Sequence, residues 1–406
     1  MTPRTPAILG GSPAFPDGLR LLRPTLPPLA ALEPSLRDAF ASGMVTKGPA
    51  LEEYERRLAE HLDVRHAVAV SSCTAGLMLV FDRFRGGEAI MPSFTFMATA
   101  TAAAWAGLDP VFCDIDPETW TLDPARVEEA LSGRTGLIVP VHVFGAPADQ
   151  EDLERIGRRR GVAVVYDAAH GFGALHDGHP VGGAGLAQVF STSPTKLLIT
   201  GEGGVVATGD DELAAHLRTG REYGNAGDYD PTFAGFNARL SEMGALFGLA
   251  SLELLEDEAR RRNALAGVYR RALAGGPGIT LQRIRLGDRS SYKDFSIRIR
   301  AAEFGLHRDE VARALDAEGV ATRAYYVPPV HRMRAFAAVG RGYERRLPET
   351  DALCDEVLTL PIYGGLSERQ IEQVADCILS LPERADEIRA ALRSSPASER
   401  DARESR

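Results

Sequence analysis

The apolar residues of one early segment recur at helical spacing. Between residues 49 and 62, Leu51, Tyr54, Leu58 and Leu62 follow one another at intervals of three or four positions, with charged residues between them. This period places the four side chains on one face of an α-helix. The pattern therefore predicts an amphipathic helix over 49–62.

Short apolar runs then alternate with longer helical patterns. The expected strands cover 66–70, 88–91, 110–113, 136–141 and 162–166, and the helices between them cover 77–84, 98–106, 124–131 and 148–159. Such alternation is typical of a mostly parallel sheet with helices packed against it. We therefore expect an α/β fold.

The later part of the chain predicts a second, smaller domain. A strand over 205–208, a helix over 211–217 and a long helical stretch over 241–274 end at the cluster 275–278, whose glycines and proline mark a boundary. A strand over 292–299 and a helix over 308–318 follow. We therefore divide the chain into an N-terminal segment with a large domain (1–275), a small C-terminal domain (276–385) and a charged tail (386–406). The tail is expected to extend a helix at its start and then to be disordered.

Composition narrows the possible functions. The chain is 44% hydrophobic and 25% charged, as in ordinary globular proteins, and its net charge of −10 with no basic run argues against nucleic-acid or anionic membrane binding. It has no apolar stretch of signal-peptide or membrane-span length. Its four cysteines lack the spacing of a zinc site, so we expect buried thiols, no metal and a cytoplasmic location.

Asp167 and Lys196 are the strongest candidates for chemistry. Asp167 follows the apolar run 162–166, which places it at the carboxyl end of a parallel strand, where α/β proteins bind ligands. Lys196 lies just before the glycine-rich turn 201–204. Pyridoxal 5'-phosphate (PLP) needs a lysine to form an imine with its aldehyde and a carboxylate to keep its pyridine nitrogen protonated. Alone, Asp167 can be a helix cap and Lys196 a surface lysine; together they predict a PLP site.

A phosphate site is expected beside this pair. The polar run 71–76 precedes a helix, whose N-terminus offers free N–H groups and a favourable dipole, and Ser191 lies close to Lys196 in the sequence. Small polar residues before a helix can equally be ordinary N-caps.

These motifs, taken in order, resemble the DegT/DnrJ/StrS-type PLP-dependent sugar aminotransferases. The resemblance spans about residues 10–382 and rests on segments 71–75, 92–96, 167–170, Lys196 with 201–204, 235–239 and 326–331. It implies PLP fold type I, the aspartate-aminotransferase-like fold. That fold has a large domain with a mostly parallel central sheet and a smaller C-terminal α+β domain.

The resemblance also implies roles for single residues around the cofactor. Asp167 pairs with the pyridine nitrogen and His170 approaches the ring hydroxyl, although His170 can also be a packed neutral imidazole. Phe96 stacks on the ring, while Phe94 can belong to the core instead. The phosphate is held by three residues of the same chain and one of a neighbouring subunit: Thr74, Ala75, Ser191 and, across the subunit boundary, Asn237.

A homodimer with shared active sites follows from the role of Asn237. Tyr326 and His331 fall in the stretch that resembles the sugar-nucleotide site, and a structural role for His331 is equally open. Cys73 stands where the family has glycine, which is tolerable if the position does not need a positive φ. Segment 191–195 lacks the Ser-Phe-His often found there, and Lys196 itself argues against the related dehydratases, which carry histidine.

The resemblance implies a ping-pong reaction with an amino-acid donor, expected to be L-glutamate. Within the family, the chain is most similar to 4-aminotransferases of nucleotide-linked 4-keto-6-deoxyhexoses from natural-product pathways. The expected activity is that of a dTDP-4-amino-4,6-dideoxy-D-glucose transaminase acting on dTDP-4-keto-6-deoxy-D-glucose. Amination at C3, a cyclitol acceptor, or a PLP-fold regulator without turnover are the alternatives.

Overall fold

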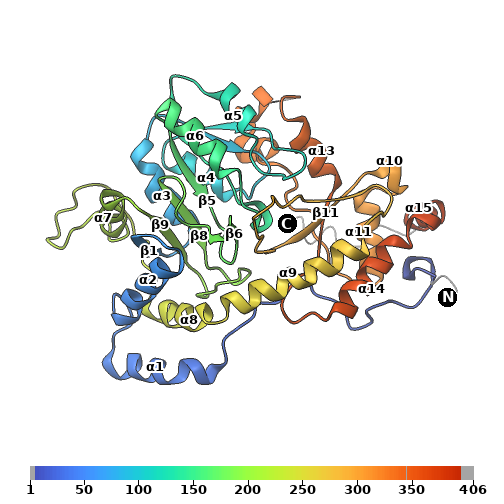
Figure 1. Cartoon of the computed structure of the whole chain (residues 1–406), viewed down its shortest axis with the longest axis horizontal. Coiled ribbons are helices and arrows are strands. Elements are labelled where there is room, and N and C mark those ends of the chain that lie inside the picture. The colour runs from blue at the N-terminus through green and yellow to red at the C-terminus, as the bar shows by residue number, and fades with distance from the viewer. Residues whose placement is uncertain (1–4, 344, 395–406) are drawn as a thin grey trace.

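The central sheet of the computed structural model has seven strands (Figure 1). The structure describes residues 5–343 and 345–394. β9 pairs antiparallel with both of its neighbours, whereas the other neighbouring strands pair in parallel. The predicted mostly parallel sheet is therefore confirmed, although the sequence pattern does not indicate β8. In spatial order the strands are β1 (His66–Val70), β9 (Gly204–Thr208), β8 (Ala187–Ser191), β5 (Ala163–Asp167), β4 (Thr135–Ile138), β2 (Glu88–Pro92) and β3 (Asp109–Cys113).

Helices bury both faces of this sheet. Along β1, Val68 and Val70 pack on one side with α3 (Cys73–Phe81), α4 (Ala98–Trp105) and α7 (Asp211–Gly220). Ala67 and Ala69 point to the opposite side, where α2 (Pro49–His61) covers them. This alternation is the period of two expected of a strand. A further cluster packs α5 (Pro124–Ala130) and α6 (Gln150–Arg160) on the sheet.

A smaller antiparallel sheet forms a second core. β11 (Phe295–Ile299) lies between β10 (Ile279–Leu281) and β12 (Val357–Leu360). Leu19 from the N-terminal segment packs into this core, so part of the segment assigned to 1–275 belongs by its packing to the smaller sheet. The division of the chain at residue 275 stays a proposal. The α-helices after β10 include α10 (Ala301–Phe304), α11 (Arg308–Ala317), α12 (Ala337–Gly340), α13 (Pro348–Glu356) and α14 (Glu368–Leu379).

The long helix expected over 241–274 is two helices. α8 (Glu242–Leu252) ends two residues before α9 (Leu255–Ala272), and the Leu254 N–H bonds to the Ser251 carbonyl at 3.1 Å, a tighter turn than an α-helix makes. Leu255 at the start of α9 packs with the core beneath α2, whereas Leu265 packs with the smaller sheet. α9 therefore links the two bodies, while α1 (Leu29–Ser42) lies along α8 (Figure 1).

The start of the expected tail is ordered. α15 (Ala385–Ser394) is a helix, in line with the helix expected at the start of the tail, and 395–406 lie outside the described residues. Ile388 and Leu392, one turn apart, are buried against the smaller core, and this burial stabilises the helix. The four cysteines are buried thiols, as expected. Among the helices that the structure describes, none combines the length and the apolar character of a membrane span.

Candidate active site

The predicted cofactor residues meet at the carboxyl ends of parallel strands. β5 ends at Asp167 and β8 ends at Ser191, and both residues line a cavity of about 330 Å³. Such strand ends are the usual ligand site of α/β sheets. Of the residues expected at the site, the cavity brings together Thr74, Phe96, Asp167, His170, Ser191, Lys196 and Tyr326.

Asp167 is aimed into the cavity by two hydrogen bonds. Thr99 Oγ1 donates to one carboxylate oxygen at 2.7 Å, and the Ala169 N–H donates to the other at 3.1 Å. Burial raises the pKa of Asp167, and these hydrogen bonds oppose the shift. A cationic ring nitrogen at this carboxylate would favour its ionised form further.

The loop that follows β8 presents Lys196. The hydroxyls of Thr192 and Thr200 lie 2.6 Å apart and close this loop at its base. Gly203 is required there, since a Cβ on it would lie 2.4 Å from the Thr200 hydroxyl. Burial and the charge of Lys293 lower the pKa of Lys196 to about 8, which keeps a fraction of the amine neutral and nucleophilic near neutral pH.

The N-terminus of α3 forms the expected phosphate end. Thr74 lines the cavity, but the Ala75 N–H already donates to Ser72 Oγ, the N-cap of the helix, at 3.1 Å. Cys73 is within the helix and has no positive φ, so its replacement of glycine causes no backbone strain. Of the residues expected to hold the phosphate in this chain, Thr74 and Ser191 line the cavity.

His170 carries an unpartnered polar atom at the cavity. Its Nδ1 is buried and has no hydrogen-bond partner among the described residues, while its carbonyl accepts from Ser291 Oγ at 2.7 Å. Burial, followed by the charges of Lys196 and Lys293, holds the pKa of His170 well below its usual value. A neutral ring nitrogen at this place is suited to a ligand hydroxyl. Together with Asp167, Lys196 and the α3 N-terminus, it fits the ring, the aldehyde and the phosphate of PLP.

The two phenylalanines of the expected ring-stacking segment separate in space. Phe96 lines the cavity and is 53% exposed, with its ring centroid 6.4 Å from that of Tyr326. Phe94 is fully buried and packs edge-on against Phe144 at 5.9 Å. Phe94 therefore belongs to the core, and Phe96 is the ring of the two that lines the cavity.

Two expected site residues lie outside the cavity lining. His331 is buried, with Nδ1 2.8 Å from Ser93 Oγ and Nε2 3.3 Å from an Asp351 carboxylate oxygen. Both ring nitrogens are thus engaged, which favours the structural alternative for His331. Asn237 is exposed and does not line the cavity of its own chain.

A family comparison agrees with this geometry. The model of the DegT/DnrJ/EryC1/StrS aminotransferase family matches residues 30–379. The chain belongs to this family. It is therefore a PLP-dependent sugar aminotransferase, and nucleotide sugars and an amino donor are the substrates that the family implies.

Several relatives are similar over nearly their whole length. The dTDP-4-amino-4,6-dideoxy-D-glucose transaminase of Escherichia coli is 31% identical, covering 88% of this chain and 97% of the relative. The dTDP-3-amino-3,4,6-trideoxy-alpha-D-glucose transaminase of Streptomyces venezuelae is 35% identical, covering 88% and 94%. The crystal structure of DesI in the presence of its TDP-sugar product superposes with a TM-score of 0.89 at 37% identity, covering 96% of this chain and 99% of DesI.

The aminotransferase cavity has a second wall that the sequence did not indicate. Lys293, Asp294, Tyr325 and Tyr326 form this part, called the loop wall, and they line the same cavity as the strand wall of Thr74, Asp167, Ser191 and Lys196. Of the loop wall, only Tyr326 was expected. Lys293 and Asp294 directly precede β11, and a charged pair immediately before a buried strand is the signal that could have marked them.

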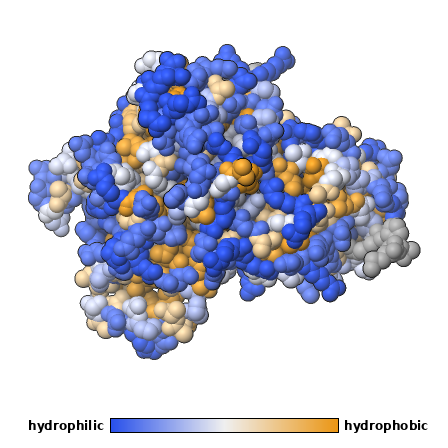
Figure 2. All heavy atoms as spheres, viewed as in Figure 1, coloured by the Kyte–Doolittle hydropathy of each residue, from blue (hydrophilic) through white to orange (hydrophobic). Residues whose placement is uncertain are grey.

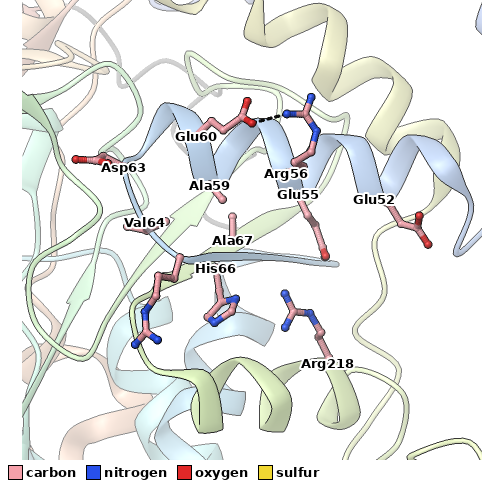
Figure 3. A pocket seen from close by; sticks show the side chains of 11 residues that line it. Glu52, Glu55, Arg56, Ala59, Glu60, Asp63, Val64, His66, Ala67 and Arg218 are labelled. Carbon is pink, nitrogen blue, oxygen red and sulfur yellow. Dashed lines mark hydrogen bonds and ion pairs between the residues drawn. The ribbon is translucent and has the colours of Figure 1, made fainter.

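A second hollow differs in its chemistry. It has a volume of about 580 Å³ and lies between α2, β1 and α7, where Figure 3 shows Glu55 and Arg218 pointing toward one another. Its charged side chains are largely paired with one another or with neighbours, as where Arg65 donates to Asp211 at 2.8 Å. Such solvated ion pairs are ordinary on a protein surface, in contrast to the buried lysine and carboxylate of the aminotransferase cavity.

Proposed function

We propose that this aminotransferase transfers the amino group of L-glutamate to the C4 ketone of dTDP-4-keto-6-deoxy-D-glucose. It would thus act as a dTDP-4-amino-4,6-dideoxy-D-glucose transaminase in deoxyaminosugar biosynthesis. The observation that carries the chemistry is the cavity in which Lys196 and Asp167 meet beside the α3 N-terminus. The acceptor is supported by similarity to the E. coli transaminase of that name along almost its full length.

Lys196 is proposed as the group that moves the proton. When bound, PLP supplies an aldehyde that carries the amino group and a ring that accepts electrons. Lys196 Nζ takes the proton from the donor's α-carbon and returns it on the cofactor side. Its lowered pKa, about 8, suits a base that must both accept and release a proton near neutral pH. Asp167, fixed by Thr99, holds the ring nitrogen protonated throughout.

We further propose a homodimer in which the partner subunit's Asn237 completes the phosphate site. The exposure of Asn237 in its own chain leaves it available to a second copy. Hydrophobic residues gather over α1 and the adjoining α8 in Figure 2, where Leu29 is 70% and Phe40 77% exposed. Apolar patches of this kind often mark protein interfaces.

The test separates the two half-reactions. The purified holoenzyme should lose the visible absorption of bound PLP when L-glutamate is added, and dTDP-4-keto-6-deoxy-D-glucose should restore it. NMR of the sugar product then locates the new amine at C4. Restoration by a 3-keto sugar nucleotide or a cyclitol ketone alone would overturn the C4 assignment. A protein that binds PLP and reacts with no donor would instead be a regulator.

The C3 reaction is the second candidate. The Streptomyces venezuelae relative named for a 3-amino sugar is 35% identical to this chain, a level comparable to the 31% of the C4 relative. The choice depends on which sugar carbon lies over the cofactor ring, and we propose that the loop wall, which lines the same cavity, sets this orientation. Competition between 3-keto and 4-keto sugar nucleotides for the same enzyme, read as the ratio of kcat/KM values, decides between them.

A further inference from the structure

Lysine is rare in this chain and concentrated at one place. Of its 46 basic residues, only Lys47, Lys196 and Lys293 are lysines. Lys47 is at the surface, where its ammonium lies 3.3 Å from Glu222 and its side chain is 59% exposed. The other two line the active-site cavity. In a chain that otherwise uses arginine for positive charge, a second cavity lysine indicates a role in the site.

Lys293 is held rigidly from both sides of its loop. Its carbonyl accepts from Arg262 Nη1 at 3.2 Å, which ties the loop to α9, and its N–H donates to Ser291 Oγ at 3.3 Å. Ser291 Oγ in turn donates to the carbonyl of His170. The backbone of Lys293 is therefore positioned against the cofactor site, and not only against the smaller sheet.

The ammonium group of Lys293 retains capacity for a ligand. Its Nζ donates to the two carboxylate oxygens of Asp294 at 2.9 and 3.0 Å and lies 5.5 Å from the ring centroid of Tyr325. A lysine ammonium has three N–H donors, and these two bonds use two of them. The third remains for an anion that enters the cavity.

The amino donor brings such an anion to the reacting centre. An α-amino acid carries its carboxylate on the same carbon that loses the amine, so this carboxylate is buried next to Lys196 during the reaction. A buried carboxylate needs a charged or hydrogen-bonding partner. Among the described residues that line the cavity, Lys196 and Lys293 are the lysines and no arginine is present, and Lys196 is committed to the cofactor and the proton.

We propose that Lys293 binds the α-carboxylate of the amino donor and that Asp294 holds Lys293 in place and balances its charge when no donor is bound. This inference rests on the proposed function, since it assumes an amino-acid donor. The charge of Lys293 also lowers the pKa of Lys196, as expected of two ammonium groups that lie near each other. The diphosphate of the sugar nucleotide is the other anion, but in a 4-keto sugar it is attached at C1, across the ring from the reacting carbon.

The experiment varies the lysine and the carboxylate together. Wild type and Lys293→Met are each given L-glutamate or L-glutamate 1-amide, in which the α-carboxylate is replaced by an uncharged amide. In wild type, half-maximal loss of the visible absorption of bound PLP should need at least about tenfold more L-glutamate 1-amide than L-glutamate. Lys293→Met should need at least about tenfold more L-glutamate than wild type and discriminate between the two donors by less than about threefold.

Matched controls isolate the charge. Lys293→Arg keeps the positive charge and should retain the preference for L-glutamate. Arg283→Met removes an exposed charge from the same part of the chain and should leave the half-maximal concentrations of both donors unchanged. The sugar half-reaction, started from the aminated enzyme, should keep its dependence on sugar concentration in Lys293→Met. Lys293→Gln provides the same comparison if the methionine variant does not fold.

The outcomes that contradict the proposal are distinct. Equal use of both donors by wild type, or unchanged discrimination in Lys293→Met, would show that Lys293 does not bind the α-carboxylate. A selective loss in the sugar half-reaction would assign Lys293 to the diphosphate instead. If wild type accepts no amino-acid donor at all, the proposed function fails together with this inference; if it does and only the variant results disagree, the proposed function stands.

Discussion

The two walls of the active-site cavity are built in different ways. The strand wall places Asp167 and Ser191 at the ends of neighbouring strands and Lys196 on a loop closed by two threonine hydroxyls. The loop wall comes from segments that are distant in sequence, and the residues before β11 reach it only because α9 and Arg262 fix them there. We therefore expect the strand wall to bind the cofactor, which the family members share. We expect the loop wall to contact the substrates, which differ between relatives.

The comparison predicts different losses when each wall is altered, and the largest comes from Lys196. Lys196→Ala removes the amine that we propose binds the cofactor and moves the proton. We expect turnover to fall on the order of 10⁴-fold or more, because no other group can replace both functions. PLP should still bind through its phosphate. Stopped-flow turnover and cofactor content measured together check this, with Arg283→Met as a control that removes an exposed charge away from the cavity. A near-normal rate in Lys196→Ala would contradict the assignment.

Asp167→Asn should have the next largest effect. The amide oxygen can still accept from Thr99 Oγ1, so the side chain keeps its place, but it no longer carries a charge for the ring nitrogen. We expect kcat to fall on the order of 10²–10³-fold with little change in the concentration of PLP needed for saturation. Thr99→Val is the companion variant, since it leaves the carboxylate and removes its hydrogen bond from Thr99 Oγ1, together with the contacts of that hydroxyl with Thr95 Oγ1 and the Phe96 carbonyl. A loss in Thr99→Val as large as that in Asp167→Asn would mean that orientation, and not charge, is the main contribution.

The strand wall is partly predictable from the sequence, because Asp167 directly follows a run with clear strand periodicity, whereas the pattern does not indicate β8, which ends at Ser191 and leads to Lys196. The predicted strands at 66–70 and 162–166 end next to residues that line the cavity, so the sequence pattern alone places Asp167 and Thr74 at the site. Ala75 is the exception, since the N-cap Ser72 already uses its N–H. Such a competition between a cap and a ligand depends on side-chain geometry that a sequence motif does not contain.

The loop wall could not be predicted in the same way. Lys293 precedes a strand whose pattern indicates burial but not what lies opposite it, and that information depends on how α9 joins the two bodies. His331 shows the same limit, because its partners Ser93 and Asp351 are separated from it in the sequence. The sequence pattern also does not predict the division of the long helical stretch into α8 and α9, since no glycine or proline stands at the break.

Substitutions at Phe94 and Phe96 test whether two neighbouring phenylalanines of one segment have different roles, one in the core and one at the cavity. Phe94→Ala should lower the free energy of unfolding by about 3–5 kcal/mol, because its ring is fully buried. Phe96→Ala should lower it by less than about 1 kcal/mol and should instead weaken the binding of PLP, since the ring is half exposed at the cavity. Urea denaturation of the apoproteins and titration with PLP separate the two effects. If Phe96→Ala left the affinity for PLP unchanged, the stacking role would be wrong.

The smallest expected effect is an increase in the stability of the apoprotein when the buried Lys196 is replaced by an uncharged residue. The pKa of Lys196 is lowered from 10.5 to about 8, so between these values the unfolded chain binds more protons than the folded one, and apoprotein stability should rise with pH. Below pH 8 the cost of burying the charge is present in full. Lys196→Met should therefore stabilise the apoprotein by roughly 1–3 kcal/mol at pH 7, and the gain should shrink as pH approaches 10.5.

Urea denaturation of the two apoproteins at pH 7 and pH 10 measures this gain, with Arg283→Met as the control for removal of an exposed charge. A gain that is the same at both pH values would come from packing of the methionine and not from removal of the charge. A gain that shrinks with pH would show that the strand wall keeps a lysine at a cost in stability, as expected of a residue retained for chemistry. Repeating the comparison in a Lys293→Met background would reduce the gain, because the loop wall contributes part of the shift in the pKa of Lys196.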